Sequence, residues 1–397
     1  MGGEIMYTLK EYIHFRKDIQ IKNDPYNDLD IAVLTALSYV RLDHLNHSLP
    51  VTLEKVYLCL KDQLDFQNEL YGHFKYYYEI FKEACLSDRY KKIQILDYQS
   101  RIDKDLTLQF SNTSFLLENG TIVIAFRGTD ETLIGWHEDF KLFYHEEIEA
   151  DRLARLYLEE KLNQTYPVTL KEALINEDYG SNKYLRFKNY QKMKHNANYI
   201  ITGHSKGGHL ALYSAFMNKE KQSKIKAIYN FDGPGLTVPV DLEQVDPQFL
   251  KKIKTFQPEY SFFGRFFLQI GKSQVVKSYN IGLAEHSLAS WKVNFDGFEQ
   301  GQSSEEVQDF LLKFNRYLET MDKKEKEFCF ETLFQILDDL AFTKASDVSE
   351  ANLKLFVRSI EHLSKIDSKI RSQIIELFKL GIGELKKSKD LLQVKED

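Results

Sequence analysis

The feature that most restricts the fold of this chain is an apolar run followed at once by a glycine-flanked serine. The run Tyr199–Thr202 has side chains that favour a β-strand, and the next residues are Gly203-His204-Ser205-Lys206-Gly207. Small and apolar side chains at 210–215 then favour a helix. Glycine on both sides of Ser205 permits a sharp, strained strand-to-helix turn that holds the hydroxyl exposed. The pattern predicts a nucleophile elbow, with a glycine-rich helix entry as the alternative.

Other short runs predict strands on both sides of this turn. They cover residues 93–96, 113–117 and 121–126 before it, and 227–231, 253–256 and 274–279 after it. Asn119-Gly120 lies between two of these runs, which predicts a type I′ hairpin with antiparallel pairing. A helix is expected to begin after Asn27, which would cap it, and to form an N-terminal wall with no visible chemistry.

The alternation of strands and helices predicts an α/β protein. We expect an α/β-hydrolase-like, mostly parallel sheet flanked by helices, with a helical cap insertion and a C-terminal helical extension. The hydrolase domain would span residues 1–300, with the insertion at about 137–195, and the helical region would span 301–397. There, Ser303 and Glu306 read as a capping box at the start of an amphipathic helix.

Composition excludes several classes of function. With 53 Lys and Arg against 59 Asp and Glu, the net charge of −6 offers no basic surface for nucleic acid. The three cysteines are far apart and lack metal-site spacing, so they read as reduced thiols of a cytoplasmic protein. The chain has no apolar run of transmembrane length, no phosphate-binding loop and no zinc-binding helix. We therefore expect no cofactor and no metal, and the oligomeric state stays open.

A serine nucleophile needs a base, and three histidines follow the turn. His209 lies on the same helix as Ser205 and cannot approach the hydroxyl from the opposite side. His362 belongs to an amphipathic helical stretch, which is typical of a packing or surface residue. His286, in a loop after a predicted strand, is the expected base, although an ordinary loop histidine is the alternative.

The acid that would orient the base is less narrowly defined, because several carboxylates lie between Ser205 and His286. Asp232 is the preferred candidate, since it ends the next strand and would face the same edge of the sheet as the serine. It also precedes Gly-Pro-Gly, so a role in the turn alone is the alternative. Glu259, after another short run, is the main competitor.

Oxyanion donors are expected from two backbone N–H groups, those of Lys206 and Thr129. The Lys206 side chain would be solvent-facing or salt-bridged and would have no catalytic duty. Arg127 is expected to tie loops together. Trp136, with the two acidic residues that follow it, is expected to anchor the next segment.

Four segments in order resemble one known family. They are Phe126-Arg127-Gly128-Thr129-Asp130, Gly135-Trp136-His137-Glu138-Asp139-Phe140, Gly203-His204-Ser205-Lys206-Gly207-Gly208 and Phe231-Asp232-Gly233-Pro234-Gly235. The resemblance is to a bacterial, lipase-like α/β-hydrolase family catalogued as a domain of unknown function and related to class 3 lipases, over roughly Asp28 to Phe298. The helical tail after Gly301 would lie outside it.

The resemblance implies lipase-like or esterase-like acyl hydrolysis. It matches Ser205 to the family nucleophile, Thr129 to the oxyanion loop and His286 to the late histidine. This chain departs from the pattern at His209, where asparagine is expected, and at Glu285-His286-Ser287, where Gln-His-Asp is expected.

Two hypotheses follow. In the first, the chain is a serine esterase or lipase that acts on a small-molecule or lipid ester, with the segment His137–His195 capping the pocket. In the second, it is a hydrolase-like scaffold with little turnover that acts as a binding module through its helical tail, because fold alone does not define function.

Overall fold

The computed structural model describes residues 7–21, 23–43, 45, 49–61, 74–130, 132–163, 198–339, 368–369 and 371–376 of the 397. His362 and residues 164–195 of the expected insertion lie outside these ranges. Whether that insertion caps a pocket, and where the chain divides into domains, therefore stay predictions.

Eight strands form one sheet, in which the spatial order follows the order along the chain. Pairing is antiparallel from β1 to β4 and parallel from β4 to β8, so four of the seven neighbouring pairs are parallel. The strands are β1 (Val51–Thr52), β2 (Gln94–Asp103), β3 (Leu108–Leu116), β4 (Ile122–Phe126), β5 (Tyr199–His204), β6 (Ile225–Phe231), β7 (Ile253–Pro258) and β8 (Lys272–Val276). The expected mostly parallel α/β-hydrolase sheet is confirmed.

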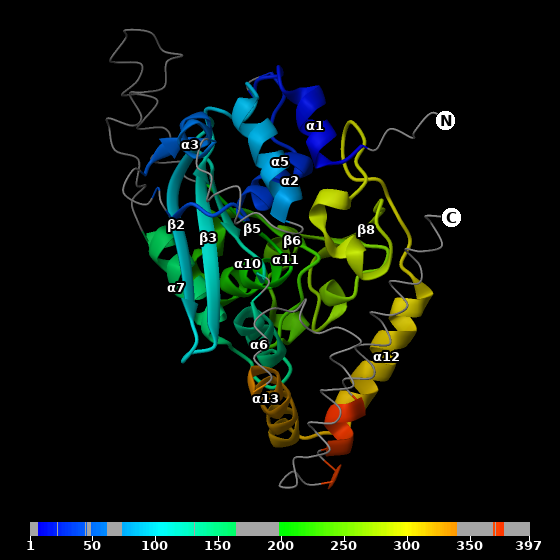
Figure 1. Ribbon diagram of the computed structural model, residues 1–397. Helices are drawn as coiled ribbons and strands as arrows, with labels where there is room; N and C mark the ends of the chain where they lie inside the picture. Colours follow the sequence, from blue (N-terminus) through cyan, green and yellow to red (C-terminus); the bar gives the residue numbers. More distant parts are fainter. Residues whose placement is uncertain are drawn as a thin grey trace.

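Helices cover both faces of this sheet (Figure 1). In the described residues, the α-helices include α1 (Leu9–Arg16), α2 (Asp28–Leu37), α3 (Leu53–Leu60), α5 (Phe74–Leu86), α6 (Leu133–Lys141), α7 (Glu149–Asn163), α10 (Lys206–Met217), α11 (Pro247–Leu250), α12 (Glu305–Glu319) and α13 (Lys323–Asp339). The N-terminal helices α1, α2 and α5 share one hydrophobic core with one face of the sheet, and α7 and α10 share a second core with the other face. Asn27 caps α2 as expected, since its side chain accepts hydrogen bonds from two backbone N–H groups of the first turn.

The hairpin between β3 and β4 is antiparallel, but its turn is not type I′. That type needs a positive φ at both central residues, whereas of Asn119 and Gly120 only the glycine has one, at 88°. The Gly120 N–H donates to the Leu117 carbonyl (2.8 Å), and the Leu117 N–H donates to the Thr121 carbonyl (2.9 Å). The loop is therefore three residues long, a turn closed by a left-handed glycine.

The described half of the expected insertion packs against the sheet. Helix α7 contacts α10 and β3, and its Leu158 and Leu162 are fully buried in the second core. Glu138, on α6, accepts a hydrogen bond from the Ala150 N–H (3.0 Å). The expectation that the acidic residues after Trp136 anchor the next segment is met in this contact.

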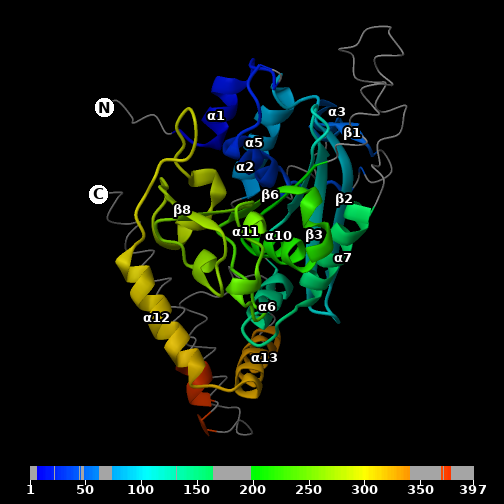
Figure 2. The ribbon, with the colours of Figure 1, turned by 180° about the vertical axis from the view of Figure 1, so that it is seen from behind.

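The C-terminal helices pack onto the hydrolase core instead of standing apart. Helix α12 begins beside the β8 edge of the sheet, and α13 contacts α6 (Figure 2). Their apolar faces share a cluster with Phe140 and Phe143. The predicted capping box is wrong, because Ser304 is the N-cap residue of α12, and the Ser303 hydroxyl accepts a hydrogen bond from the Gln308 side chain (2.7 Å).

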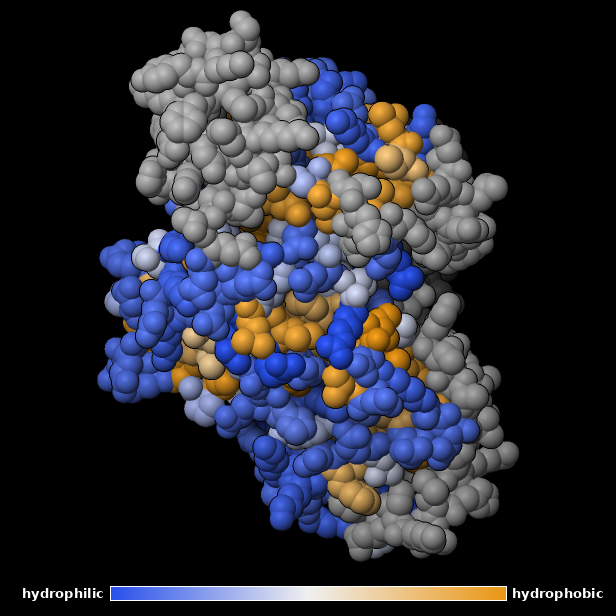
Figure 3. Space-filling model, turned by 90° about the vertical axis from the view of Figure 1, so that its left-hand side faces the viewer, coloured by the Kyte–Doolittle hydropathy of each residue, from blue (hydrophilic) through white to orange (hydrophobic). Residues whose placement is uncertain are grey.

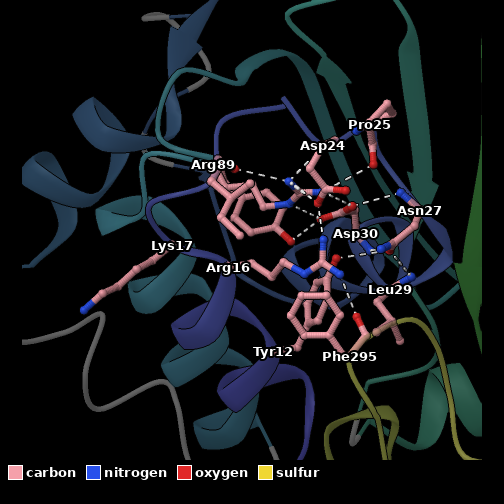
Figure 4. A network of polar contacts seen from close by, with 12 residues as sticks. Tyr12, Arg16, Lys17, Asp24, Pro25, Asn27, Leu29, Asp30, Arg89 and Phe295 are labelled. Carbon is pink, nitrogen blue, oxygen red and sulfur yellow. Dashed lines mark hydrogen bonds and ion pairs between the residues drawn. The ribbon is translucent and has the colours of Figure 1, made fainter. Parts of the chain in front are cut away.

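A buried ion network fastens the N-terminal helices together (Figure 4). The guanidinium of Arg89 makes two bonds to the Asp30 carboxylate, of 2.7 and 2.6 Å, and both side chains are fully buried. Tyr90 adds a third bond to Asp30 (2.5 Å), and Arg16 joins the network through Asp24. Burial works against the charge on Arg89, but Asp30 raises the pKa of that guanidinium above its ordinary value.

The surface beside β2 and α7 is mostly hydrophilic, with smaller hydrophobic areas between (Figure 3). Exposed apolar side chains in these elements and in the turn after β2 include Ile102, Leu106 and Leu156. Such scattered groups are ordinary for a protein surface. Among the described residues, none of the helices has the length and apolar character needed to cross a membrane.

Replacing Arg89 by methionine would leave the Asp30 carboxylate buried without its cation. Removing one partner of a buried ion pair costs about 3–5 kcal/mol, so the free energy of unfolding measured in urea should fall by about that amount. Arg101→Met is the matched control, because Arg101 pairs with Asp103 while half of its side chain is exposed. We expect little change in this control, and equal losses in the two variants would contradict the prediction.

Candidate active site

Ser205 occupies the strained turn that the sequence predicts. It lies between β5 and α10 with φ 58° and ψ −132°, a conformation that a residue with a side chain rarely adopts. Its N–H donates to the carbonyl of Phe231 (3.0 Å), and its own carbonyl accepts from the Gly208 N–H (2.8 Å). The side chain is partly exposed, whereas its neighbours His204 and Lys206 are buried.

Glycines let α10 lie against the sheet at this turn. A Cβ on Gly207 would fall 2.1 Å from the Phe126 carbonyl oxygen, and one on Gly208 would fall 2.2 Å from the side chain of Asn230. A Cβ on Gly203 would meet the Gly207 carbonyl at 2.0 Å. Gly203 and Gly207 are therefore required by close backbone approaches, and Gly208 leaves room for the Asn230 side chain.

Asp232 follows β6, which lies beside the strand that leads into Ser205. Its φ is 52°, a left-handed conformation that the Asn230 side chain supports by bonding both the N–H and the carbonyl of Gly233 (2.8 and 2.9 Å). The carboxylate is fully buried and points back to the site. Asp232 thus shapes the turn and also presents its carboxylate to a partner.

That partner is His286, whose Nδ1 lies 2.6 Å from Asp232 Oδ2. The other carboxylate oxygen accepts from the Ser261 hydroxyl (2.5 Å). Burial raises the pKa of Asp232 to about 7, and the bonds from Ser261 and from the Gly264 N–H act in the opposite direction. The predicted base and the preferred acid are in direct contact.

His286 also lies beside the nucleophile turn. Its carbonyl is 2.6 Å from His204 Nε2, and the centres of the two imidazole rings are 4.6 Å apart. His286 itself is partly exposed, with 22% of its side chain accessible. Phe263 packs on its ring at 4.7 Å, so one side of the imidazole faces an aromatic surface.

The competing acid, Glu259, has a different partner. Its carboxylate accepts from the Gln302 N–H (2.9 Å), which ties the chain before α12 to the end of β7. Glu285, at one departure from the family pattern, accepts from the Tyr260 N–H (3.0 Å) and from the Gly282 N–H. Burial raises the pKa of Glu285 to about 7. A carboxylate can accept these two bonds, so the departure is compatible with an ordered loop.

The two predicted oxyanion residues lie on facing segments next to Ser205. A Cβ on Gly128, which precedes Thr129, would come within 3.0 Å of the Ser205 Cβ. The Thr129 hydroxyl donates to Asp139 Oδ2 (2.5 Å), which holds this loop to α6. Burial raises the pKa of Asp139 to about 6, and the charge of Lys206 opposes that rise.

The Lys206 side chain is salt-bridged and buried. Its Nζ lies 2.8 Å from Glu138 Oε2 and donates to the carbonyl of Gln109 (2.9 Å). His209 is likewise buried, with Nε2 3.0 Å from Asp151 Oδ1 and Nδ1 bonded to the Gly235 carbonyl (2.8 Å). These contacts explain why neither side chain is available to act at Ser205.

Sequence reasoning missed three residues that organise the site, namely Ser261, Asn230 and His204. Ser261 and Asn230 have no motif of their own, because their roles depend on loops that meet only in the folded chain. His204 stood in the motif itself. Its position before the serine, at the end of a buried strand, was the signal that it points into the protein.

A model of the Mbeg1-like family matches residues 84–335, and the chain belongs to this lipase-like family. The match begins later than the resemblance predicted, and it continues past Gly301 through α12 and most of α13. The expectation that the helical tail lies outside the family is therefore wrong for the tail up to residue 335, and residues 336–397 lie outside the match. The matched part of the tail packs on the rest of the domain, because α12 and α13 share an aromatic cluster with α6. A search among curated proteins found no match.

Solved structures similar to this chain include fungal lipases. The mono- and diacylglycerol lipase from Aspergillus oryzae is 12% identical, with 69% of this chain and 90% of that one covered and a TM-score of 0.37. Lipase II from Rhizopus niveus is 12% identical, with 77% and 92% covered and a TM-score of 0.34. A further fungal lipase is 13% identical, with 70% and 90% covered and a TM-score of 0.35.

Adding one methyl group at Gly207 should disrupt the turn. Because a Cβ there would overlap the Phe126 carbonyl, α10 has to move away from β4, and overpacking of this kind costs about 1–3 kcal/mol or more. We expect Gly207→Ala to lower the free energy of unfolding in urea accordingly. Gly297→Ala is the control, since nothing lies within 4 Å of a Cβ at that position. An unchanged stability of Gly207→Ala would refute the close approach.

Proposed function

We propose that this chain is a serine hydrolase, esterase-like or lipase-like, that cleaves carboxylic esters through an acyl-enzyme on Ser205. One observation carries the proposal: the buried Asp232 carboxylate holds His286 at 2.6 Å, beside a serine on a strained strand-to-helix turn. Family membership and the fold support a hydrolase scaffold. A nucleophile, a base and an orienting acid in this chain order supply the groups that acyl transfer needs.

In the proposed reaction, the Ser205 Oγ attacks the ester carbonyl while His286 Nε2 takes its proton. Asp232 accepts the bond from the Nδ1–H of His286, so it keeps Nε2 free as the base and stabilises the imidazolium that forms. His286 then protonates the departing alcohol. Water attacks the acyl-enzyme with His286 again as base, which releases the acid and restores the serine.

The oxyanion of each tetrahedral intermediate would be bound by the backbone N–H groups of Lys206 and Thr129. The Thr129 hydroxyl bond to Asp139 supports this role, because it holds the loop in one orientation before substrate arrives. The Lys206 ammonium stays with Glu138 and donates nothing to the substrate.

The aromatic surroundings of the base support an ester with an apolar acyl group. Phe263 packs on His286, and Trp136 packs edge-on against Phe263 at 6.2 Å. We also propose a cytoplasmic location. The free thiols Cys59, Cys85 and Cys329 support it, because thiols persist in a reducing compartment.

A fluorophosphonate probe tests the proposal directly, since it reacts only with an activated serine. We expect the wild-type chain to be labelled and Ser205→Ala to show no labelling. His286→Ala should hydrolyse p-nitrophenyl butyrate at least about 1,000-fold more slowly, because the serine loses its base.

His14→Ala is the matched control, as His14 is an exposed histidine on α1 and its loss should leave the rate unchanged. Folded wild-type protein that takes no label would contradict the proposed serine hydrolase activity. The binding-scaffold hypothesis would then be the remaining one. A rate unaffected by His286→Ala would refute that residue as the base.

The pH profile tests the acid. Asp232 must be ionised to pair with a charged His286, so with a pKa of about 7 the rate should fall as the pH drops through about 7. Ser261→Ala removes a bond that stabilises the carboxylate, so the pKa of Asp232 rises and the fall should begin about one pH unit higher.

Rates of p-nitrophenyl butyrate hydrolysis between about pH 5 and pH 9 measure this shift. Ser214→Ala removes a buried hydroxyl that bonds only within α10, and it should leave the profile in place. A shift to lower pH in Ser261→Ala, or equal shifts in both variants, would contradict the assignment of Asp232.

A further inference from the structure

His204 is a buried histidine with both ring nitrogens engaged. Only 3% of the residue is exposed. Its Nδ1 lies 2.6 Å from the Tyr39 hydroxyl, and its Nε2 lies 2.6 Å from the carbonyl oxygen of His286. One contact therefore reaches the N-terminal helical layer, and the other reaches the backbone of the proposed base.

Chemistry determines which nitrogen carries the proton. A carbonyl oxygen can only accept a hydrogen bond, so the Nε2 that faces His286 must be the N–H donor. Nδ1 of the neutral ring then has a lone pair and accepts from the Tyr39 hydroxyl. The His286 carbonyl thus selects this tautomer, and the Tyr39 hydroxyl bonds its Nδ1 and fixes the orientation of the ring.

Tyr39 is suited to this role because it is always protonated. Burial raises the pKa of its hydroxyl far above the ordinary value. The phenol oxygen also accepts from the Gly128 N–H, in the loop that leads to Thr129. Tyr39 and His204 in this way join the proposed oxyanion loop to the loop that carries the proposed base.

A second tyrosine of the same layer reaches the same loop. Tyr77, on α5, stacks on Tyr39 with ring centres 4.4 Å apart and planes 8° from parallel. Its hydroxyl oxygen accepts from the Ser287 hydroxyl and from the Leu288 N–H. The residues that follow His286 are therefore held by the same layer that bonds His204 through Tyr39.

We propose that Tyr39 and His204 are positioning residues for His286. Tyr39 fixes the orientation of the His204 ring, and His204 then fixes the backbone of the base at the nucleophile turn. Without the Tyr39 hydroxyl, the buried His204 ring loses the bond that fixes its orientation, so its bond to the His286 carbonyl weakens. This inference rests on the proposed function for its effect on rate, but not for its effect on the loop.

Tyr39→Phe tests it, because the ring and its stacking on Tyr77 remain while the hydroxyl is lost. We expect kcat for p-nitrophenyl butyrate to fall about 10–100-fold, as a misplaced base does, with KM changed less than about twofold. Tyr90→Phe is the matched control. It removes another buried hydroxyl of this layer, bonded to Asp30, and should lower stability without changing kcat.

A rescue separates positioning from packing. A glutamine at position 204 places an amide N–H near the site of Nε2 and donates to the His286 carbonyl whatever its neighbour is. We expect the double variant Tyr39→Phe/His204→Gln to recover most of the kcat lost in Tyr39→Phe. A double variant slower than the single one would overturn the positioning argument.

Hydrogen exchange of residues 283–290 gives a readout that needs no activity. Exchange there should be faster in Tyr39→Phe than in wild type and unchanged in Tyr90→Phe. If Ser205 takes no fluorophosphonate label, the proposed function fails and exchange alone decides whether Tyr39 holds this loop. Unchanged exchange in Tyr39→Phe would overturn the inference, whether or not the wild-type chain is active.

Discussion

The close approach of α10 to the sheet is the constraint on which the site depends. Gly207 lies against the end of β4, and Gly208 lies against the Asn230 side chain at the end of β6. With α10 at that distance, the chain can connect β5 to the helix only through a strained residue, and that residue is Ser205. The packing of α10 against the ends of β4 and β6 keeps Ser205 in this strained conformation, because a turn held by one loop alone could relax.

Buried basic side chains on α10 determine which acidic side chains lie beside this helix. The helix carries Lys206 and His209 into the protein, and each needs a counter-charge there because an unpaired buried charge is costly. Glu138 and Asp151 supply them from α6 and α7. His209 stands where the family pattern expects asparagine. It is thus paired with Asp151 on α7. The same pairs tie the helix behind the nucleophile to the segment that holds Thr129.

Much of this arrangement could be predicted from the sequence, and the part that could not has a physical reason. Strand ends are readable, because Ser205 and Asp232 follow apolar runs and the carboxyl ends of parallel strands meet at one edge. The sequence favours Asp232 over Glu259 but does not decide between them, since both follow predicted strands. The choice depends on the position of the 261–264 loop, because Ser261 bonds Asp232 only in the folded chain. The β3–β4 turn was misjudged because Asn119-Gly120 fits two loop lengths that differ by a single residue.

Segments far from the central motifs complete the site. The N-terminal helices read as a wall without chemistry, yet Tyr39 ends hydrogen-bonded to His204. At the other end of the chain, Glu331 on α13 contacts His137 and Tyr144 on either side of α6's last turn, at 3.1 and 2.7 Å. Helix α6 carries Asp139, so the orientation of the Thr129 loop depends on a helix that is itself held by α13. A chain cut before α12 would expose the aromatic face of α6, because that face packs against α12 and α13.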